Sequence, residues 1–198
     1  REDVEIDSVM QDGHQGGLLA VAHLVARGHR RIAWFGSLVN EAHSKDRFGG
    51  FAAGMIAAGL PLGPESAVSV NAAQALDRAR EWLSKPGRPT GIVAPWGELA
   101  AAVARAAADL NLRPGHDLDI VGWSMAEVCG TDYRALFPDG HVPATVTWSV
   151  RTMAEAALAR LTERRANPGL PALRVKIPVK LVEESEVRDQ KSEVRRKT

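Results

Sequence analysis

The most constraining feature of this chain is the repeated alternation of short apolar runs with longer segments whose apolar residues recur at helical spacing. The runs expected as strands are residues 4–9, 32–35, 67–70, 91–94 and 118–123. The segments expected as helices between them are residues 16–27, 48–56, 72–83 and 98–111. Strands that alternate with helices of this length form βαβ units with right-handed crossovers. The sequence therefore predicts an α/β protein built on a parallel sheet.

The last third of the chain departs from this alternation. Residues 125–143 are expected to form a long loop with a turn of helix at 133–137, followed by a short strand or crossover at 145–148. A helix over 150–164 should turn Met153, Ala157, Leu158 and Leu161 inward. Residues 174–182 alternate charged and apolar side chains, which favours an edge strand. The remainder, to residue 198, is charged throughout.

Composition excludes several classes of protein. The formal net charge of +1 provides no general attraction to nucleic acid or to an anionic membrane. A single cysteine, Cys129, rules out an internal disulfide framework and suits a reducing cytoplasm. No apolar run is long enough to span a bilayer, and the first residues lack the pattern of a signal peptide. The chain also begins without Met, which is compatible with a fragment.

Motifs for common enzyme chemistry are absent from the sequence. There is no Walker loop, no dinucleotide fingerprint, no nucleophile elbow and no zinc-protease motif. The histidines lack the spacing of metal ligands, and Cys129 has no neighbouring cation to activate it. Gly49 and Gly50 lie within a helical pattern, where close packing explains them better than a phosphate cradle. We therefore expect no catalytic residues, no metal and no cofactor.

Ligands of open α/β sheets usually bind outside the carboxyl ends of the strands. In this chain those ends are expected at Phe35-Gly36, Val70-Asn71, Ala94-Pro95-Trp96 and Trp123-Ser124. The sequence therefore directs the search for a site to this edge.

One stretch carries a specific resemblance. Residues 22–36, AHLVARGHRRIAWFG, resemble the signature HLxxxGHxxIAxxxG of the effector-binding domains of lac-repressor (LacI/GalR) family regulators. Further segments are similar to family motifs in the same order: 46–51, 91–100, 118–123, 145–161 and 177–182. The resemblance covers residues 4–187.

The resemblance implies a periplasmic-binding-protein-like fold. Two doubly wound parallel-sheet lobes are joined by three crossovers, with the effector between them. It assigns residues 1–36 and 149–167 to an N-terminal lobe, which is incomplete here, and residues 38–147 and 172–187 to a C-terminal lobe. Residues 188–198 are expected to be a disordered charged tail. The helix-turn-helix and hinge with which the family begins are absent from this sequence.

Arg47 is the foremost candidate for effector binding. It begins a helix after the first crossover loop, where its guanidinium can contact hydroxyls, a carboxylate or a phosphate. The alternative is a surface arginine paired with Asp46 or another acid.

Two departures from the family pattern bear on the ligand. Trp96-Gly97 replaces an Asn-Asp pair, and Ser124-Met125 replaces a pair of aspartates. Together with Trp123 these residues offer aromatic and soft apolar surface instead of carboxylates. We expect a ligand flatter and less polar than a typical sugar, or a cleft that has lost its response. Core packing is the alternative role for Trp123.

Weaker candidates complete the expected effector site. Asp12 is expected to be a helix cap rather than a ligand group. The remaining candidates are His14, Gln15, His43, Asn71 and Trp148.

The sequence thus favours a non-enzymatic, ligand-sensing domain of a cytoplasmic, DNA-binding transcriptional regulator, with repression as the expected output. A small sugar-like or aromatic effector would alter the operator affinity of a homodimer, and DNA would be read only by a helix-turn-helix outside this chain. The alternative is a transport-type solute-binding protein for a sugar-like nutrient, and an enzyme on a doubly wound sheet is a second one. A helix-turn-helix upstream would support the regulator, and a signal peptide or lipobox the transport protein.

Overall fold

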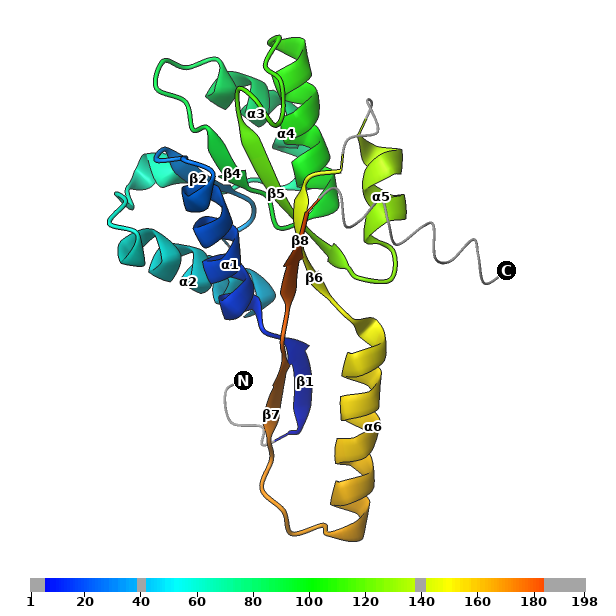
Figure 1. The fold of residues 1–198 in the computed structure, drawn as a ribbon. Helices are drawn as coiled ribbons and strands as arrows, with labels where there is room; N and C mark the ends of the chain where they lie inside the picture. Colours follow the sequence, from blue (N-terminus) through cyan, green and yellow to red (C-terminus); the bar gives the residue numbers. More distant parts are fainter. Residues whose placement is uncertain (1–5, 39–41, 138–141, 184–198) are drawn as a thin grey trace.

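The computed structural model describes residues 6–38, 42–137 and 142–183, and its elements follow the predicted alternation (Figure 1). The strands are β1 (Ser8–Gln11), β2 (Ile32–Phe35), β3 (Ala67–Val68), β4 (Gly91–Val93), β5 (Asp119–Met125), β6 (Ala144–Trp148), β7 (Arg174–Ile177) and β8 (Lys180–Val182). The α-helices are α1 (Gly13–Ala26), α2 (Ala42–Ala57), α3 (Ala75–Leu83), α4 (Gly97–Asp109), α5 (Cys129–Leu136) and α6 (Val150–Ala166). Two short 3-10 helices are η1 (Pro64–Ser66) and η2 (Ala72–Gln74).

A six-stranded sheet forms the centre of the larger part of the molecule. Its order is β3-β2-β4-β5-β6-β8, and all neighbours are parallel except β6 and β8. Helices cover both faces, with α1 and α2 packed on one and α3, α4 and α5 on the other. Residues of β4 and β5 alternate between the two clusters: Ile92 and Ile120 belong to one, Val93 and Val121 to the other. The predicted α/β fold with a parallel sheet is confirmed; we call this part the body.

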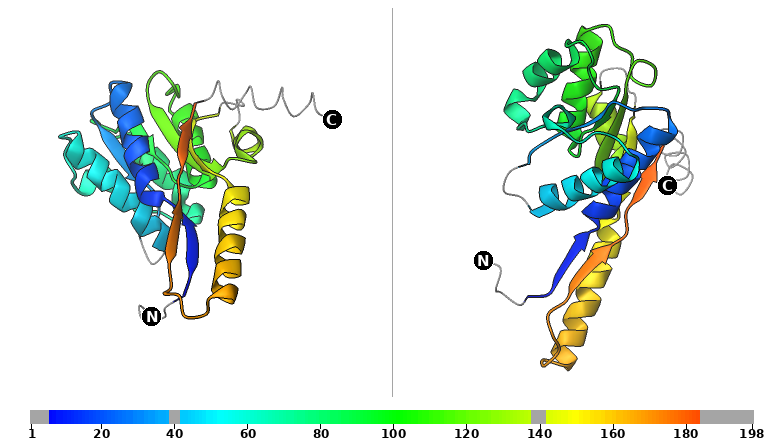
Figure 2. Two further views of the ribbon diagram at one scale, coloured as in Figure 1. Left: turned by 60° about the horizontal axis from the view of Figure 1, so that its bottom comes forward. Right: turned by 90° about the vertical axis from the view of Figure 1, so that its left-hand side faces the viewer.

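A smaller unit extends from the body as an arm (Figures 1 and 2). It consists of the parallel pair β1-β7 and the helix α6, which packs against both strands. The register pairs Ser8 with Arg174 and Gln11 with Ile177. The buried Arg160 of α6 joins this unit to Asp7, because its Nε lies 2.8 Å from a carboxylate oxygen of Asp7.

The sheets divide the chain at points that differ from the expected lobe ranges. The chain leaves the arm directly after β1, since α1 packs on α2 and β2 lies inside the body sheet, whereas we expected residues 1–36 to stay together. The single strand expected over residues 174–182 is two strands in two sheets, interrupted at Pro178. Glycines explain the first difference: a side chain on Gly17 or Gly50 would meet the backbone of the facing helix, so only glycines allow this contact.

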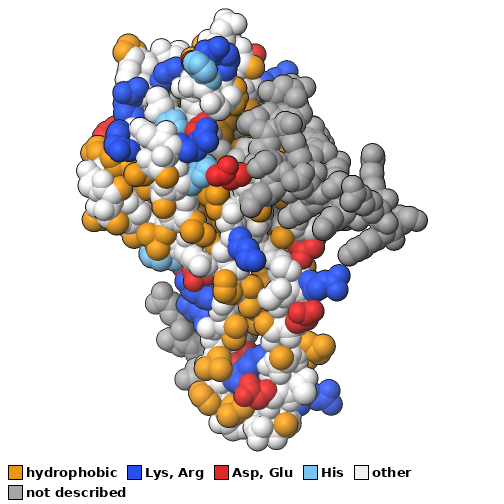
Figure 3. All heavy atoms as spheres, viewed as in Figure 1, with side chains coloured by type: hydrophobic (Ala, Val, Ile, Leu, Met, Phe, Trp, Pro, Cys, Tyr) orange, Lys and Arg blue, Asp and Glu red, His pale blue; other side chains and the backbone are white. Residues whose placement is uncertain are grey.

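Several local expectations also need correction. Leu18 was expected on the buried face of its helix but is exposed, because the glycines of α1 form the contact. On α6 the only buried residue is Arg160, while Leu158 and Leu161 are exposed, since no described element covers that face. Hydrophobic side chains are visible over the arm in Figure 3. The expected turn of helix at 133–137 is the longer helix α5.

Some expectations fall wholly or partly outside the described residues. These are the charged tail at 188–198, the first residues of the strand expected at 4–9, residues 138–141 of the expected loop and residues 184–187 of the expected C-terminal lobe. Within the described ranges, every helix is too short or too polar to cross a bilayer.

Candidate functional site

The carboxyl ends of the parallel body strands meet at the edge that faces the arm (Figure 1). Helix α1 begins at the same edge, and Asp46 and Arg47 of α2 lie against Gly13 at its start. The candidate site is therefore built from strand ends and helix starts that the topology brings to one place. Open α/β sheets bind their ligands at such an edge.

Arg47 lies at the centre of this edge, surrounded by aromatic rings. Its guanidinium carbon is 4.7 Å from the ring centroid of Trp123, 5.2 Å from that of Trp96 and 5.7 Å from that of Trp148. Its Nη1 donates a hydrogen bond of 2.8 Å to the carbonyl oxygen of Pro95. Each ring face attracts the cation, and the effect is larger when the charge is removed from water. We call Arg47, Trp96, Trp123 and Trp148 the arginine cage.

The expected alternative for Arg47, a surface residue paired with Asp46, is wrong. Only 6% of Arg47 is exposed, and the Asp46 carboxylate has other partners. It accepts a hydrogen bond from the backbone N–H of His14 at 3.2 Å and lies 3.0 Å from Nζ of Lys176. Lys176 also lies 3.5 Å from Asp12, and the hydrogen bond to Asp46 raises the pKa of its ammonium group. Because Lys176 belongs to β7, this cluster joins the arm to the body.

Trp123 combines both roles that the sequence left open for it. Its ring is buried against α1, where a side chain on Gly16 would lie 2.3 Å from it, so it is part of the core. The same ring faces Arg47. Its indole Nε1 donates a 2.7 Å hydrogen bond to Gln11 Oε1, at the last residue of β1. Trp123 therefore connects the arm, α1 and the arginine cage.

Residues after β5 and around α5 form a hollow beside the cage. Trp96, Trp123 and Ser124 line this cavity of about 540 Å³ together with Tyr133 and Leu136. Ser124 is buried, whereas Met125 is 37% exposed. The expected apolar and aromatic surface is thus present at these strand ends.

The remaining candidates serve local structure or lie apart from the cage. Asp12 caps α1 as predicted, accepting from the backbone N–H of Gln15 at 3.0 Å. The Gln15 side chain accepts in turn from the N–H of Val179 at 2.9 Å, which ties the last crossover to α1. Asn71 caps η2 beyond the edge strand β3, and His43 is exposed in the first turn of α2.

Sequence reasoning missed Gln11, Asp46 and Lys176. Gln11 lies two residues beyond the strand predicted over 4–9 and is the last residue of β1, so a correct strand end would have drawn attention to it. Lys176 lies within a strand whose partner the sequence does not reveal, so no local signal distinguished it.

Comparison with known proteins decides the family. Residues 21–185 match the family model described as a periplasmic binding protein-like domain. The chain belongs to this family. The resemblance to effector-binding domains of lac-repressor-type regulators is confirmed as well, because the relatives of this periplasmic binding protein-like domain are regulators of that type.

Two curated relatives and one solved structure illustrate the similarity. The arabinose metabolism transcriptional repressor of Geobacillus stearothermophilus is 32% identical over 127 residues, which cover 61% of this chain and 35% of the relative. The ribose operon repressor of Escherichia coli K12 is 28% identical over 128 residues, covering 64% and 39%. The structure of a LacI-family regulatory protein from Chloroflexus aggregans superposes with a TM-score of 0.80 at 24% identity, covering 93% and 65%. The domain thus corresponds to only part of each protein.

The crossover into α6 of this periplasmic binding protein-like domain has its own polar anchor. The Glu127 carboxylate accepts hydrogen bonds from Ser149 Oγ at 2.7 Å and from the backbone N–H groups of Val150 and Arg151, each at 3.2 Å. The bond from Ser149 and the two backbone bonds outweigh desolvation and lower the pKa of Glu127 to about 2. A carboxylate at a helix N-terminus is favourable, so Glu127 fixes the start of α6 to the end of β5. Among the described residues, no group of His, Cys, Asp and Glu is arranged to hold a metal ion.

Proposed function

We propose that this chain is the ligand-sensing part of a DNA-binding transcriptional regulator, in which a small effector binds between the arm and the body. The observation that carries the proposal is the arginine cage at the carboxyl edge of the body sheet. A buried cation between tryptophan rings at a strand-end edge is a recognition element. The relatives of the domain are named as repressors, which supports regulation as the output.

The effector that suits the cage is a compact ring with a flat face. Trp96 and Trp148 are half-buried, so each has surface that a sugar ring or an aromatic ring can cover. A hydroxyl or carboxylate on the ring would reach the Arg47 guanidinium. The residues after β4 and β5 are Trp96-Gly97 and Ser124-Met125, which carry no carboxylate, and Glu98 is the acidic residue that lines the adjacent hollow. The proposed class is therefore a sugar-like or flatter aromatic molecule with few hydroxyls.

The output is a change in the orientation of the arm. Lys176 contacts Asp12 and Asp46 across one crossover, and Glu127 holds α6 at another. An effector that binds one orientation more tightly shifts the population toward it. In a homodimer in the cytoplasm, this orientation would set the spacing of two helix-turn-helix units that lie outside the present sequence. Spacing decides whether both operator half-sites are contacted.

A thermal-shift screen of sugars, nucleosides and aromatic acids tests the proposal. A ligand that binds only the folded state raises the melting temperature. We expect at least one compound class to do so, with the shift strongly reduced in Arg47→Gln and Trp96→Leu. Arg105 is an exposed arginine on α4, so Arg105→Gln is the matched control. Its melting temperature should rise with ligand as much as that of the unmodified protein. A hit that Arg47→Gln binds at full strength would show that the cage is not the effector site.

A further inference from the structure

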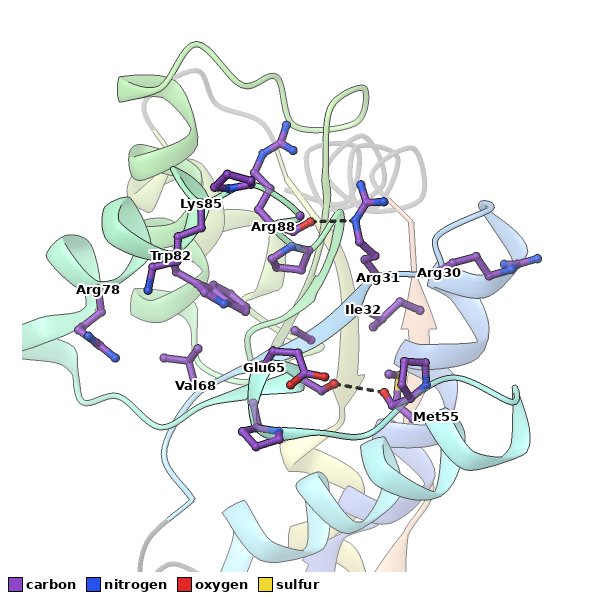
Figure 4. A pocket seen from close by; sticks show the side chains of 18 of the residues that line it. Arg30, Arg31, Ile32, Met55, Glu65, Val68, Arg78, Trp82, Lys85 and Arg88 are labelled. Atoms are coloured by element: carbon purple, nitrogen blue, oxygen red, sulfur yellow. Dashed lines mark hydrogen bonds between the residues drawn. The ribbon is translucent and has the colours of Figure 1, made fainter.

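A second hollow lies on the body at the opposite end of β2 from the arginine cage (Figure 4). Its volume is about 590 Å³, within the range of roughly 300–1,000 Å³ typical of small-molecule sites. The first residues of β2, Met55 of α2, the edge strand β3, the end of α3 and the loop 85–89 line it. We call it the rear pocket. Arg47 and the three tryptophans of the cage contribute nothing to its lining, so the two sites are separate.

Trp82 forms an aromatic wall of the rear pocket. One face of its ring stacks on Phe35, with centroids 5.6 Å apart and planes inclined by 19°. Phe35 is fully buried, whereas Trp82 is only half-buried. Figure 4 shows the Trp82 ring beside the central space, with Val68, Ile32 and Met55 around the same space. Because Phe35 packs against one face of the Trp82 ring and part of that ring stays exposed, a second planar group can stack on Trp82.

The rear pocket is also strongly cationic at its rim. Five of its lining residues are Arg or Lys and only Glu65 is acidic. Glu81 already neutralises two of the cations, lying 2.6 Å from Arg78 and 2.9 Å from Lys85.

Two of the remaining cations, Arg31 and Arg88, belong to neighbouring segments of the rim. Arg31 Nε donates a 3.1 Å hydrogen bond to the backbone carbonyl oxygen of Arg88. Within the described part of the chain, neither Arg31 nor Arg88 has an ion-pair partner, so both charges are uncompensated. The third, Arg30, donates to the carbonyl oxygens of Val25 and His29. The side chains of Arg31 and Arg88 extend from the rim to one side of the central space (Figure 4). An anion at the rim would therefore meet Arg31 and Arg88 together.

We propose that the rear pocket binds a small planar anion of the nucleotide class, with its ring on Trp82 and its phosphate at Arg31 and Arg88. The apolar floor and the aromatic wall suit a base, and two guanidinium groups on the same rim, without ion-pair partners among the described residues, suit a phosphate. Neutral sugars lack the charge that this rim recognises. The regulator would thus carry a second ligand site, and this proposal stands whether or not the arginine cage binds an effector.

Isothermal titration calorimetry of the purified protein with adenosine 5′-monophosphate tests the proposal. We expect saturable binding at one site per chain. Adenosine and inorganic phosphate, each of which offers half of the recognised chemistry, should bind at least about tenfold more weakly. Absence of saturation at millimolar nucleotide, or equal affinity for adenosine, would overturn the proposal.

Variants locate the site. Arg31→Gln/Arg88→Gln and Trp82→Leu should each weaken nucleotide binding at least about tenfold, with leucine keeping apolar contact to Phe35. Arg105→Gln/Arg165→Gln removes the same charge from exposed positions outside the pocket and should bind normally. If the control variant lost as much nucleotide affinity as the rim variant, binding would be due to general charge attraction, and this would contradict the proposal. If Arg47→Gln lost nucleotide binding while Arg31→Gln/Arg88→Gln kept it, the nucleotide would bind at the arginine cage. This result would also overturn the proposal.

Discussion

Individual glycines decide how closely helices α1 and α2 approach. A Cβ atom on Gly50 would lie 1.9 Å from the backbone oxygen of His14, and one on Gly17 would lie 2.3 Å from the backbone nitrogen of Phe51. The neighbouring Gly49 has more room, because its nearest atom would be His14 Nδ1 at 3.6 Å. The sequence-based interpretation of this pair as close packing is therefore confirmed for Gly50. This approach places Arg47 against the start of α1.

Gly50→Ala should destabilise the protein by about 1–3 kcal/mol or more, because the two helix backbones must separate. Gly49→Ala is the matched control, and it should be neutral or stabilise by roughly 0.5–1 kcal/mol through higher helix propensity. Urea unfolding curves of the two variants measure the difference. Equal midpoints for both variants would contradict the packing argument.

Helix α6 has an N-terminal polar anchor and little buried surface. Ser149 caps its first turn by accepting from the N–H of Thr152 at 3.1 Å, and Glu127 accepts from the two N–H groups before it, those of Val150 and Arg151. Only Arg160 of this helix is buried, while Val150, Leu158 and Leu161 are exposed. A helix with so little buried surface relies on capping and charge at its ends.

The stabilisation by Glu127 should therefore depend on pH. Its pKa is lowered from the ordinary 4.5 to about 2, so the contribution is complete above the unfolded value and is lost as the pH falls toward 2. Because the carboxylate is exposed, we expect Glu127→Gln to cost only about 0.5–1 kcal/mol near neutral pH. Unfolding free energies of both proteins between pH 6 and pH 2.5 should converge on the acid side. A difference that stays constant across this range would exclude the carboxylate as its source.

The body and the arm differ in how much apolar surface each of them buries. Both buried apolar clusters lie in the body, almost all on its six-stranded sheet and the helices that cover it. The arm has a two-stranded sheet, one helix and a polar tie through Arg160. Stability within a protein follows the density of buried apolar contacts, so the parts should open separately.

Native-state hydrogen exchange should reveal this division. We expect amides of β1, β7 and α6 to exchange through openings of lower free energy than those of β2, β4 and β5. An effector bound at the arginine cage should slow exchange in the arm, since it would contact both parts. Equal protection throughout the chain would mean that arm and body open as one cooperative unit.

The alternation of strands and helices, the parallel sheet and the family could be predicted from the sequence, because hydrophobic periodicity and local motifs are properties of neighbouring residues. The sequence also indicates Arg47 and Trp96 as candidates; Trp96 follows β4 as expected, whereas Arg47 lies in the second turn of α2 and not at the start of a helix. Only the tertiary structure decided that β2 lies in the body, that residues 174–182 divide between two sheets, and that Trp123 bonds Gln11 while Lys176 meets Asp46. The contacts of Trp123 with Gln11 and of Lys176 with Asp46 join residues 112 and 130 positions apart. Each of these pairings depends on the shape of both partners, which no local pattern contains.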